Sequence, residues 1–265
     1  LTLDKLTMAA YFGIISTLVA ALFSACVSFS PLDYGYPDQQ QDLYQAALDL
    51  FGPQAYEQEV SDFESDIIED PRWPNPSTDL GITAGVATDS NGDVYVFTRG
   101  SREWTQGSFS DKNVFTGKDA IDHDVIMKIS SKTGKVIDSW GSGMFYMPHG
   151  ISVDSEDNIW VTDVALHQVF KFPNGSKEAS LTLGTKLEPG DDDTHFCKPT
   201  DVAVSSTGEF FVSDGYCNSR IIKYSKEGKI LKQWGEDAGV LSVFMGKSVP
   251  NGAFNVPHGL ALAED

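Results

Sequence analysis

The sequence predicts an all-β protein of the propeller class, and two observations predict it. One phrase recurs from residues 84, 149, 200 and 258, as "AGVATDSNGDVYVFTRG", "HGISVDSEDNIWVTDVA", "TDVAVSSTGEFFVSDGY" and "HGLALAED". Each complete copy has two short alternating runs joined by a turn rich in Gly, Asn, Asp and Ser, which is the pattern of a β-hairpin. Repeats of roughly fifty residues made of strands and turns are typical of propeller blades.

The chain divides into three parts. An uncharged and mainly apolar run at 8–29, "MAAYFGIISTLVAALFSACVSF", predicts an export signal over 1–29. Its small residues at 24–26 suit a cleavage site, but the run is also long enough to be an uncleaved anchor. Residues 30–80 are acidic and punctuated by prolines, which predicts a linker or pro-segment. The propeller domain is expected over 81–265.

The repeats in this domain predict about three complete blades and the opening strand of a fourth. The stretches "VFKFPNGSKEASLTLG" and "IIKYSKEGKILKQWG" are expected to supply outer strands. Propellers typically carry four to eight blades, and an open ring would leave strand edges unpaired. The chain is therefore expected to be truncated at its C-terminal end.

The charge and the cysteine content limit which cellular compartments and which classes of ligand are expected. A net charge of −19 argues against nucleic acid and against anionic membrane surfaces, and it favours small molecules or cationic peptides. Membrane attachment is expected only through the N-terminal segment. With Cys26 inside that segment, Cys197 and Cys217 are expected to pair in an oxidising compartment. The sequon at Asn174 fits the same secretory route, to a vesicle or the cell exterior.

Two histidines stand out within the repeat. Aligning the copies places Ala84, His149, Thr200 and His258 at one structural position. In a six-bladed ring, His149 and His258 would converge from alternate blades, and a third His expected beyond Asp265 would complete a zinc site. The alternative is that this His only caps a turn and was duplicated with the repeat. Surface or packing roles are expected for the other histidines, His123, His167 and His195.

An arginine and a tyrosine are further candidates. Arg99 stands where the later copies have Asp163 and Asp214, and its planar guanidinium suits binding of a carboxylate. Tyr216, directly before Cys217, could serve as a general base if it lies near a metal ion and an arginine. The alternatives are a solvent-facing Arg99 and a Tyr216 that only packs its ring.

Three phrases carry a family resemblance: "MPHGISVDSEDNIWVTDVALHQVFKF", "HFCKPTDVAVSSTGEFFVSDGYCNSRI" and "VPHGLALAED". Over residues 82–265 the chain resembles the peptidyl-α-hydroxyglycine α-amidating lyases, whose domain is a six-bladed propeller of NHL-type repeats. The resemblance implies zinc ligands at His149 and His258, and catalytic roles for Tyr216 and Arg99.

It further implies a structural calcium ion held by the backbone carbonyls of Val86 and Ile151, and it supports the pairing of Cys197 with Cys217. The implied reaction converts a peptidyl-α-hydroxyglycine to a peptide amide and glyoxylate. A monomer is expected, supplied with substrate by a separate copper-dependent peptidylglycine monooxygenase. Two alternatives remain at this point: a non-catalytic NHL-repeat propeller that binds peptides, and a calcium-dependent lactonase-like propeller, which would favour carboxylate ligands.

Overall fold

The computed structural model describes residues 70–235 and 252–263. The export signal predicted at 1–29 and most of the acidic segment predicted at 30–80 lie outside the described residues. Among those described, no helix is long and apolar enough to cross a membrane.

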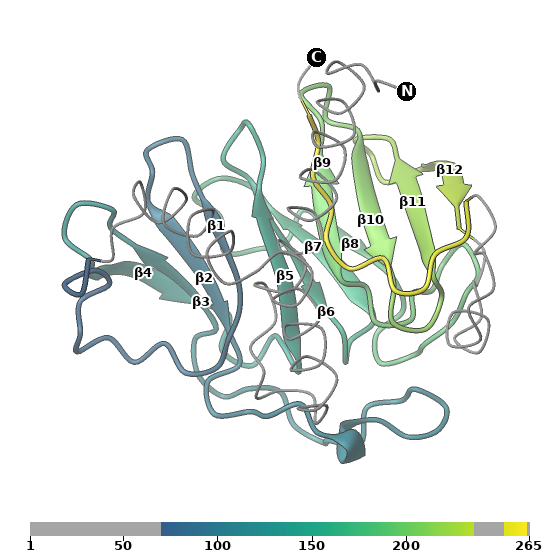
Figure 1. The fold of residues 1–265 in the computed structure, drawn as a ribbon, viewed down its shortest axis with the longest axis horizontal. Coiled ribbons are helices and arrows are strands. Elements are labelled where there is room, and N and C mark those ends of the chain that lie inside the picture. The colour runs from purple at the N-terminus through teal and green to yellow at the C-terminus, as the bar shows by residue number, and fades with distance from the viewer. Residues whose placement is uncertain (1–69, 236–251, 264–265) are drawn as a thin grey trace, which may run out of the picture. The chain divides into compact units, whose positions relative to one another are not determined.

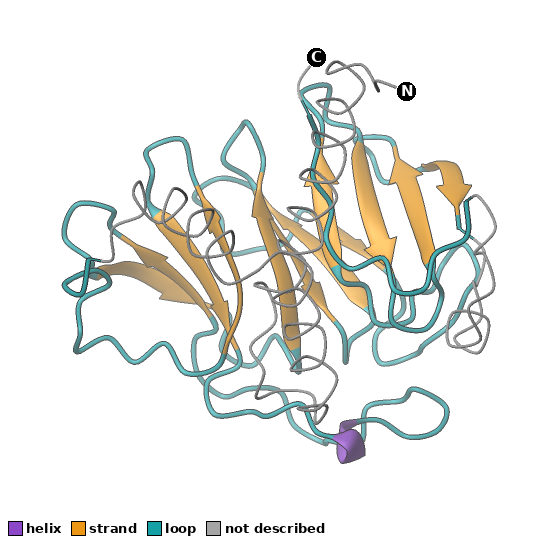
Figure 2. Ribbon diagram, in the orientation of Figure 1, coloured by secondary structure: helices purple, strands orange, loops and turns teal. Residues whose placement is uncertain are grey.

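The described chain forms three antiparallel four-stranded sheets, each with its strands in chain order (Figure 1). Apart from one short 3-10 turn at Gln106–Ser108, the regular structure consists of strands (Figure 2). The all-β prediction and the three complete blades are therefore confirmed, whereas the opening strand of a fourth blade, predicted from residue 258, is not formed in the described residues 252–263. Blade 1 contains β1 (Thr83–Thr88), β2 (Val94–Thr98), β3 (Ile126–Ile129) and β4 (Val136–Trp140). Blade 2 contains β5 (Pro148–Val153), β6 (Ile159–Asp163), β7 (Gln168–Phe172) and β8 (Leu181–Leu183). Blade 3 contains β9 (Asp201–Val204), β10 (Phe210–Asp214), β11 (Arg220–Tyr224) and β12 (Ile230–Trp234).

The first hairpin of every blade turns at a residue in the left-handed region. These residues are Gly92 with φ 78°, Asp157 with φ 60° and Gly208 with φ 85°. Glycine adopts this conformation at no steric cost, and Asp tolerates it better than most residues. In blades 1 and 2 the turn is also closed by Asp89 and Asp154, whose carboxylates accept backbone N–H groups two and four residues further on. The repeated turn residues thus set the register of each hairpin.

The first strands of successive blades lie against one another, β1 beside β5 and β5 beside β9. Gly85 and Gly150, which follow the equivalent positions Ala84 and His149, make this approach possible. A Cβ on Gly85 would lie 3.0 Å from the carbonyl oxygen of His149, and one on Gly150 would lie 2.3 Å from that of Thr200. Only glycine leaves room for backbones this close. The Gly150 of the first "HG" phrase is therefore a packing requirement of the inner strands, whereas a Cβ on Gly259 of the second would meet nothing within 4 Å.

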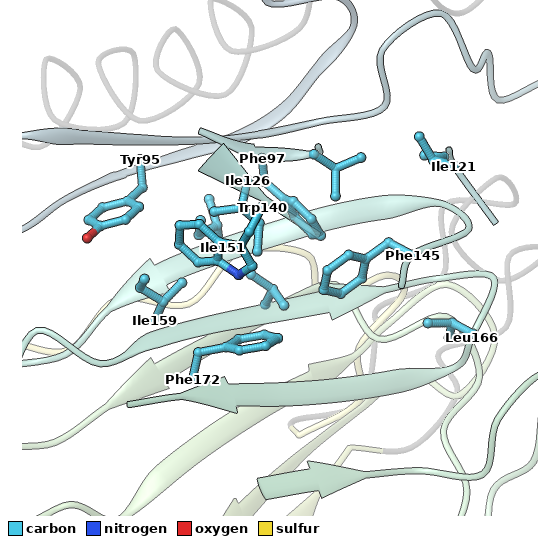
Figure 3. Packing of buried hydrophobic residues seen from close by; sticks show 12 residues of the cluster. Tyr95, Phe97, Ile121, Ile126, Trp140, Phe145, Ile151, Ile159, Leu166 and Phe172 are labelled. Carbon is cyan, nitrogen blue, oxygen red and sulfur yellow. The ribbon is translucent and has the colours of Figure 1, made fainter. Parts of the chain in front are cut away.

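Aromatic and branched side chains fill the space between blades. Tyr95, Phe97 and Trp140 of blade 1 face Ile151 and other apolar residues of blade 2 in one buried cluster (Figure 3). A second cluster joins blade 2 to blade 3. These two layers hold the blades together and so determine where the strand ends stand.

Candidate active site

The two predicted histidines come together in the structure. His149 is buried at the start of β5, whereas His258 lies in the segment 252–263 and is exposed. Their ring centroids are 4.8 Å apart. The register supports the alignment on which the prediction depended, because the inner-strand residues two positions after Ala84, His149 and Thr200 all pair with the third residue of the next strand.

Tyr216 bridges this pair through its hydroxyl. Its Oη lies 3.1 Å from Nε2 of His149 and 2.7 Å from Nε2 of His258. Nδ1 of His149 lies 2.9 Å from the carbonyl oxygen of Thr200, which can only accept, so Nδ1 carries the proton. The Nε2 lone pair of neutral His149 therefore accepts from the Tyr216 hydroxyl, and Nε2–H of His258 donates to the same oxygen. One carbonyl thus determines the tautomer at the site.

Both imidazoles are favoured in the neutral form. Burial lowers the pKa of His149 to about 3, with smaller contributions from the nearby positive charges of His258 and Arg99. The pKa of His258 is also lowered, because its ring is partly desolvated. Neutral imidazoles are the form that binds metal ions.

Arg99 and Trp104 form one wall of this site. Nε of Arg99 donates to the carbonyl oxygen of Pro148 at 2.8 Å, and its guanidinium carbon lies 5.6 Å from the ring centroid of Trp104. The Trp104 ring in turn lies 5.0 Å from that of Tyr216. Arg99, Tyr216 and His149 are therefore gathered around a single indole. Trp104 was not among the residues predicted from the sequence.

The predicted alignment of Arg99 with the strand-end aspartates was wrong by one residue. β2, β6 and β10 have equal lengths and end at Thr98, Asp163 and Asp214. Asp163 and Asp214 accept backbone N–H groups from the segment preceding their own blade. The Thr98 hydroxyl instead donates to the carbonyl oxygen of Ile82, at 3.1 Å, in the segment before blade 1. Arg99 lies one position further along the chain, and from there its side chain reaches the site.

A disulfide fastens the loop that carries Tyr216. Cys197 and Cys217 are bonded, with their Cα atoms 5.4 Å apart, which confirms the predicted pairing. Asp214, two residues before Tyr216, accepts from the backbone N–H of Cys197 at 2.8 Å and pairs with Nε of Arg220 at 2.9 Å. The backbone of Tyr216 is therefore held on both sides.

We expect replacement of both cysteines by serine, Cys197→Ser with Cys217→Ser, to lower the free energy of unfolding by about 3 kcal/mol. The reason is that the bond closes a loop of 20 residues and restricts the unfolded chain. Denaturant unfolding of the secreted protein measures the change, and wild type unfolded in the presence of a thiol reductant is the control. Two free thiols in the secreted wild-type protein would contradict the expectation.

The described residues support the predicted zinc and calcium sites only in part. Within 70–235 and 252–263 no group of three or more His, Cys, Asp or Glu side chains is placed to hold a metal ion. The two imidazole Nε2 atoms that converge there are of the kind that zinc takes as ligands. Val86 and Ile151 occupy equivalent positions on the adjacent strands β1 and β5. Their calcium role stays a prediction.

The other three histidines lie apart from the pair. His167 is fully buried and accepts from the backbone N–H of Lys198 at 3.0 Å, so it is a packing residue. His123 and His195 lie nearer the surface beside Asp122 and Asp192. These positions agree with the sequence prediction.

Comparisons with known proteins agree with the fold. The NHL repeat family matches residues 145–172 and 196–224. "Peptidyl-glycine alpha-amidating monooxygenase" of Mus musculus is 47% identical over 194 residues, covering 72% of this chain and 19% of its own length. "Probable peptidyl-alpha-hydroxyglycine alpha-amidating lyase pgal-1" of Caenorhabditis elegans is 38% identical over 248 residues, covering 94% of this chain and 65% of its own. "Peptidyl-alpha-hydroxyglycine alpha-amidating lyase 1" of Drosophila melanogaster is 44% identical over 200 residues, covering 73% and 36%.

The repeats and the three blades define an NHL-repeat propeller protein. Over most of its length the chain is a homologue of the peptidyl-α-hydroxyglycine α-amidating lyases. It spans between 19% and 65% of the length of the three relatives named above.

Proposed function

We propose that this protein is a zinc-dependent lyase that cleaves the N–Cα bond of a peptidyl-α-hydroxyglycine, releasing a peptide amide and glyoxylate. The observation that carries the proposal is the Tyr216 hydroxyl held between the Nε2 atoms of His149 and His258. A phenol placed between two neutral imidazoles, beside an arginine, combines a metal-binding pair with a proton acceptor and a carboxylate partner. The reaction is the one for which the two homologous lyases are named.

His149 and His258 would hold the zinc ion. The contact from Nδ1 of His149 to the Thr200 carbonyl oxygen keeps the Nε2 lone pair directed into the site, as is usual for metal-bound histidines. Catalytic zinc sites typically take three protein ligands, so we propose a third from outside the described residues. When bound, zinc supplies a Lewis acid for the substrate hydroxyl oxygen.

Tyr216 and Arg99 would perform the remaining steps. Tyr216 would act in its ionised form: its oxygen takes the proton of the substrate hydroxyl, the N–Cα bond breaks as the C–O bond becomes the aldehyde of glyoxylate, and the same proton passes to the departing amide nitrogen. The Arg99 guanidinium binds the carboxylate of the glyoxylate half, for which its planar fork is suited. Its positive charge also stabilises negative charge that develops as the bond breaks.

The structural calcium ion and the source of the substrate that we propose follow from the same family. Calcium, which prefers oxygen ligands, would bind the backbone carbonyls of Val86 and Ile151 and so tie β1 to β5. The substrate would come from a separate copper-dependent peptidylglycine monooxygenase in the secretory pathway. Asn174, exposed in the turn between β7 and β8, would be accessible for glycosylation there.

We expect the secreted protein to release glyoxylate from a peptide ending in α-hydroxyglycine, to lose this activity after chelation, and to regain it with zinc. His149→Ala should lose bound zinc and turnover together, because it removes a buried ligand, whereas His195→Ala, which removes a surface imidazole, should keep both. Mass spectrometry of the amide product measures turnover, and elemental analysis measures bound zinc. A His149→Ala protein with full zinc content and turnover would refute the assignment.

A further inference from the structure

Trp104 lies on the long connection between β2 and β3, and its indole lies beside most of the candidate site. Its ring centroid is 5.0 Å from that of Tyr216 and 6.1 Å from that of His149. The guanidinium carbon of Arg99 lies 5.6 Å from the same indole centroid. One half-buried side chain therefore adjoins a proposed metal ligand, the proposed base and the proposed carboxylate partner.

The indole is itself held from behind. Phe109 packs against Trp104 with ring centroids 5.3 Å apart, and the Lys198 ammonium lies 4.2 Å from the Phe109 centroid. The same ammonium donates to Oδ1 of Asn113 at 2.9 Å. Lys198 belongs to the segment just before β9, so the connection that starts in blade 1 is fastened to blade 3.

The contacts of the Trp104 indole restrain the orientation of the Tyr216 phenol and of the Arg99 guanidinium. The Tyr216 hydroxyl lies within hydrogen-bond distance of both imidazoles, and the Trp104 ring beside the phenol restricts the room in which its side chain can turn away. The attraction between a cation and an indole face keeps the Arg99 guanidinium beside the site instead of in solvent.

We propose that Trp104 is a positioning residue, which holds the Tyr216 phenol and the Arg99 guanidinium in the orientation that the reaction needs. The kinetic part of this inference rests on the proposed lyase function, but the packing of Tyr216 can be measured without turnover. Misplacing a reacting group by about 1 Å can cost on the order of 10²-fold in rate. Because Trp104 itself touches neither substrate nor metal in this proposal, the loss should fall mainly on kcat, while the loosened Arg99 guanidinium, which binds the substrate carboxylate, raises KM to a smaller extent.

The test compares Trp104→Leu with Trp104→Phe and with a matched control, Trp234→Leu. Trp234 is also half-buried, packs on Phe211 at 6.1 Å and carries the Lys232 ammonium 4.9 Å from its ring centroid, but it lies on β12. Trp104→Leu should lower kcat by roughly 10-fold to 100-fold, with a smaller rise in KM and with zinc content retained. Trp104→Phe, which keeps an aromatic wall, should recover most of this loss, and Trp234→Leu should match wild type.

Nitration by tetranitromethane, followed by peptide mapping, gives a second readout that needs no activity. Tyr216 should react several-fold faster in Trp104→Leu than in wild type or Trp104→Phe, while the buried Tyr95 serves as an internal reference. If the nitration rate rises and even wild type releases no glyoxylate, the lyase function fails and the positioning role stands. Unchanged nitration, a loss confined to KM, or a loss of zinc would each overturn the proposal.

Discussion

Tyr216→Phe is expected to abolish turnover while the zinc content stays at the wild-type level. Phe keeps the ring that packs against Trp104, so the local fold should survive. The change removes only the Oη atom that lies between the two Nε2 atoms and that we assign to accept the substrate proton. Positioned general bases are typically worth on the order of 10²- to 10⁴-fold in rate. Single-turnover kinetics and elemental analysis on the same preparation measure both quantities.

Two results would change this mechanism in different ways. A Phe variant without zinc would make Tyr216 a metal ligand. A variant that keeps more than about a tenth of wild-type kcat, well short of the loss expected for a general base, would move the proton to another acceptor. Tyr34→Phe, a change of the same kind outside the propeller domain, is the matched control.

Arg220→Met is expected to lower the free energy of unfolding by about 3–5 kcal/mol at neutral pH, the usual cost of leaving a buried charge without its partner. Arg220 and Asp214 are both buried, with Nε 2.9 Å from Oδ2. Arg220 also donates from Nη2 to the carbonyl oxygen of His195 at 2.7 Å, which links it to the segment before Cys197. Methionine fills much of the space but satisfies none of these acceptors.

The pH dependence of Arg220→Met follows from Asp214. Burial raises the pKa of this carboxyl group, against the opposing effects of Asn218 and Arg220, and removal of Arg220 raises it further. A carboxyl whose pKa is higher in the folded state loses stability as pH rises from its unfolded value, about 3.9, through its folded value. The deficit of the variant should therefore shrink as pH falls and Asp214 becomes protonated.

Denaturant unfolding at several pH values checks this expectation. Arg72→Met is the matched control, because Arg72 pairs with Asp70 in an exposed ion pair at 2.9 Å and should change stability little. An Arg220→Met deficit as small as that of the control, or one that grows as pH falls, would contradict the expected role of the buried pair.

The convergence of the two histidines could be predicted because residues at the same position of successive repeats take the same place in their blades. Once the hairpins are aligned on their turn residues, His149 and Thr200 must occupy the same place on neighbouring inner strands. The disulfide could be predicted for a simpler reason, since only Cys197 and Cys217 remain outside the N-terminal segment. Both predictions depend on patterns that the chain itself repeats or limits.

The misalignment of Arg99 and the omission of Trp104 also have physical reasons. Arg99 was misaligned because the letters "FT" and "VT" match at the strand end, whereas the backbone aligns the left-handed residues Gly92 and Asp157. Trp104 was missed because the connection between β2 and β3 has no strand periodicity, so nothing in its sequence indicates where its side chains turn. The ring contacts with Tyr216 and His149 in the structure are what place Trp104 beside the site.

The placement of His258 after all twelve described strands has a consequence for biosynthesis. A ribosome delivers the chain from its N-terminus, so the blades and the disulfide partners emerge before the second imidazole does. Until then the Tyr216 hydroxyl has His149 but not His258 as a neighbour. A nascent chain can therefore pair the strands of the three described sheets before the second imidazole of the site has been translated.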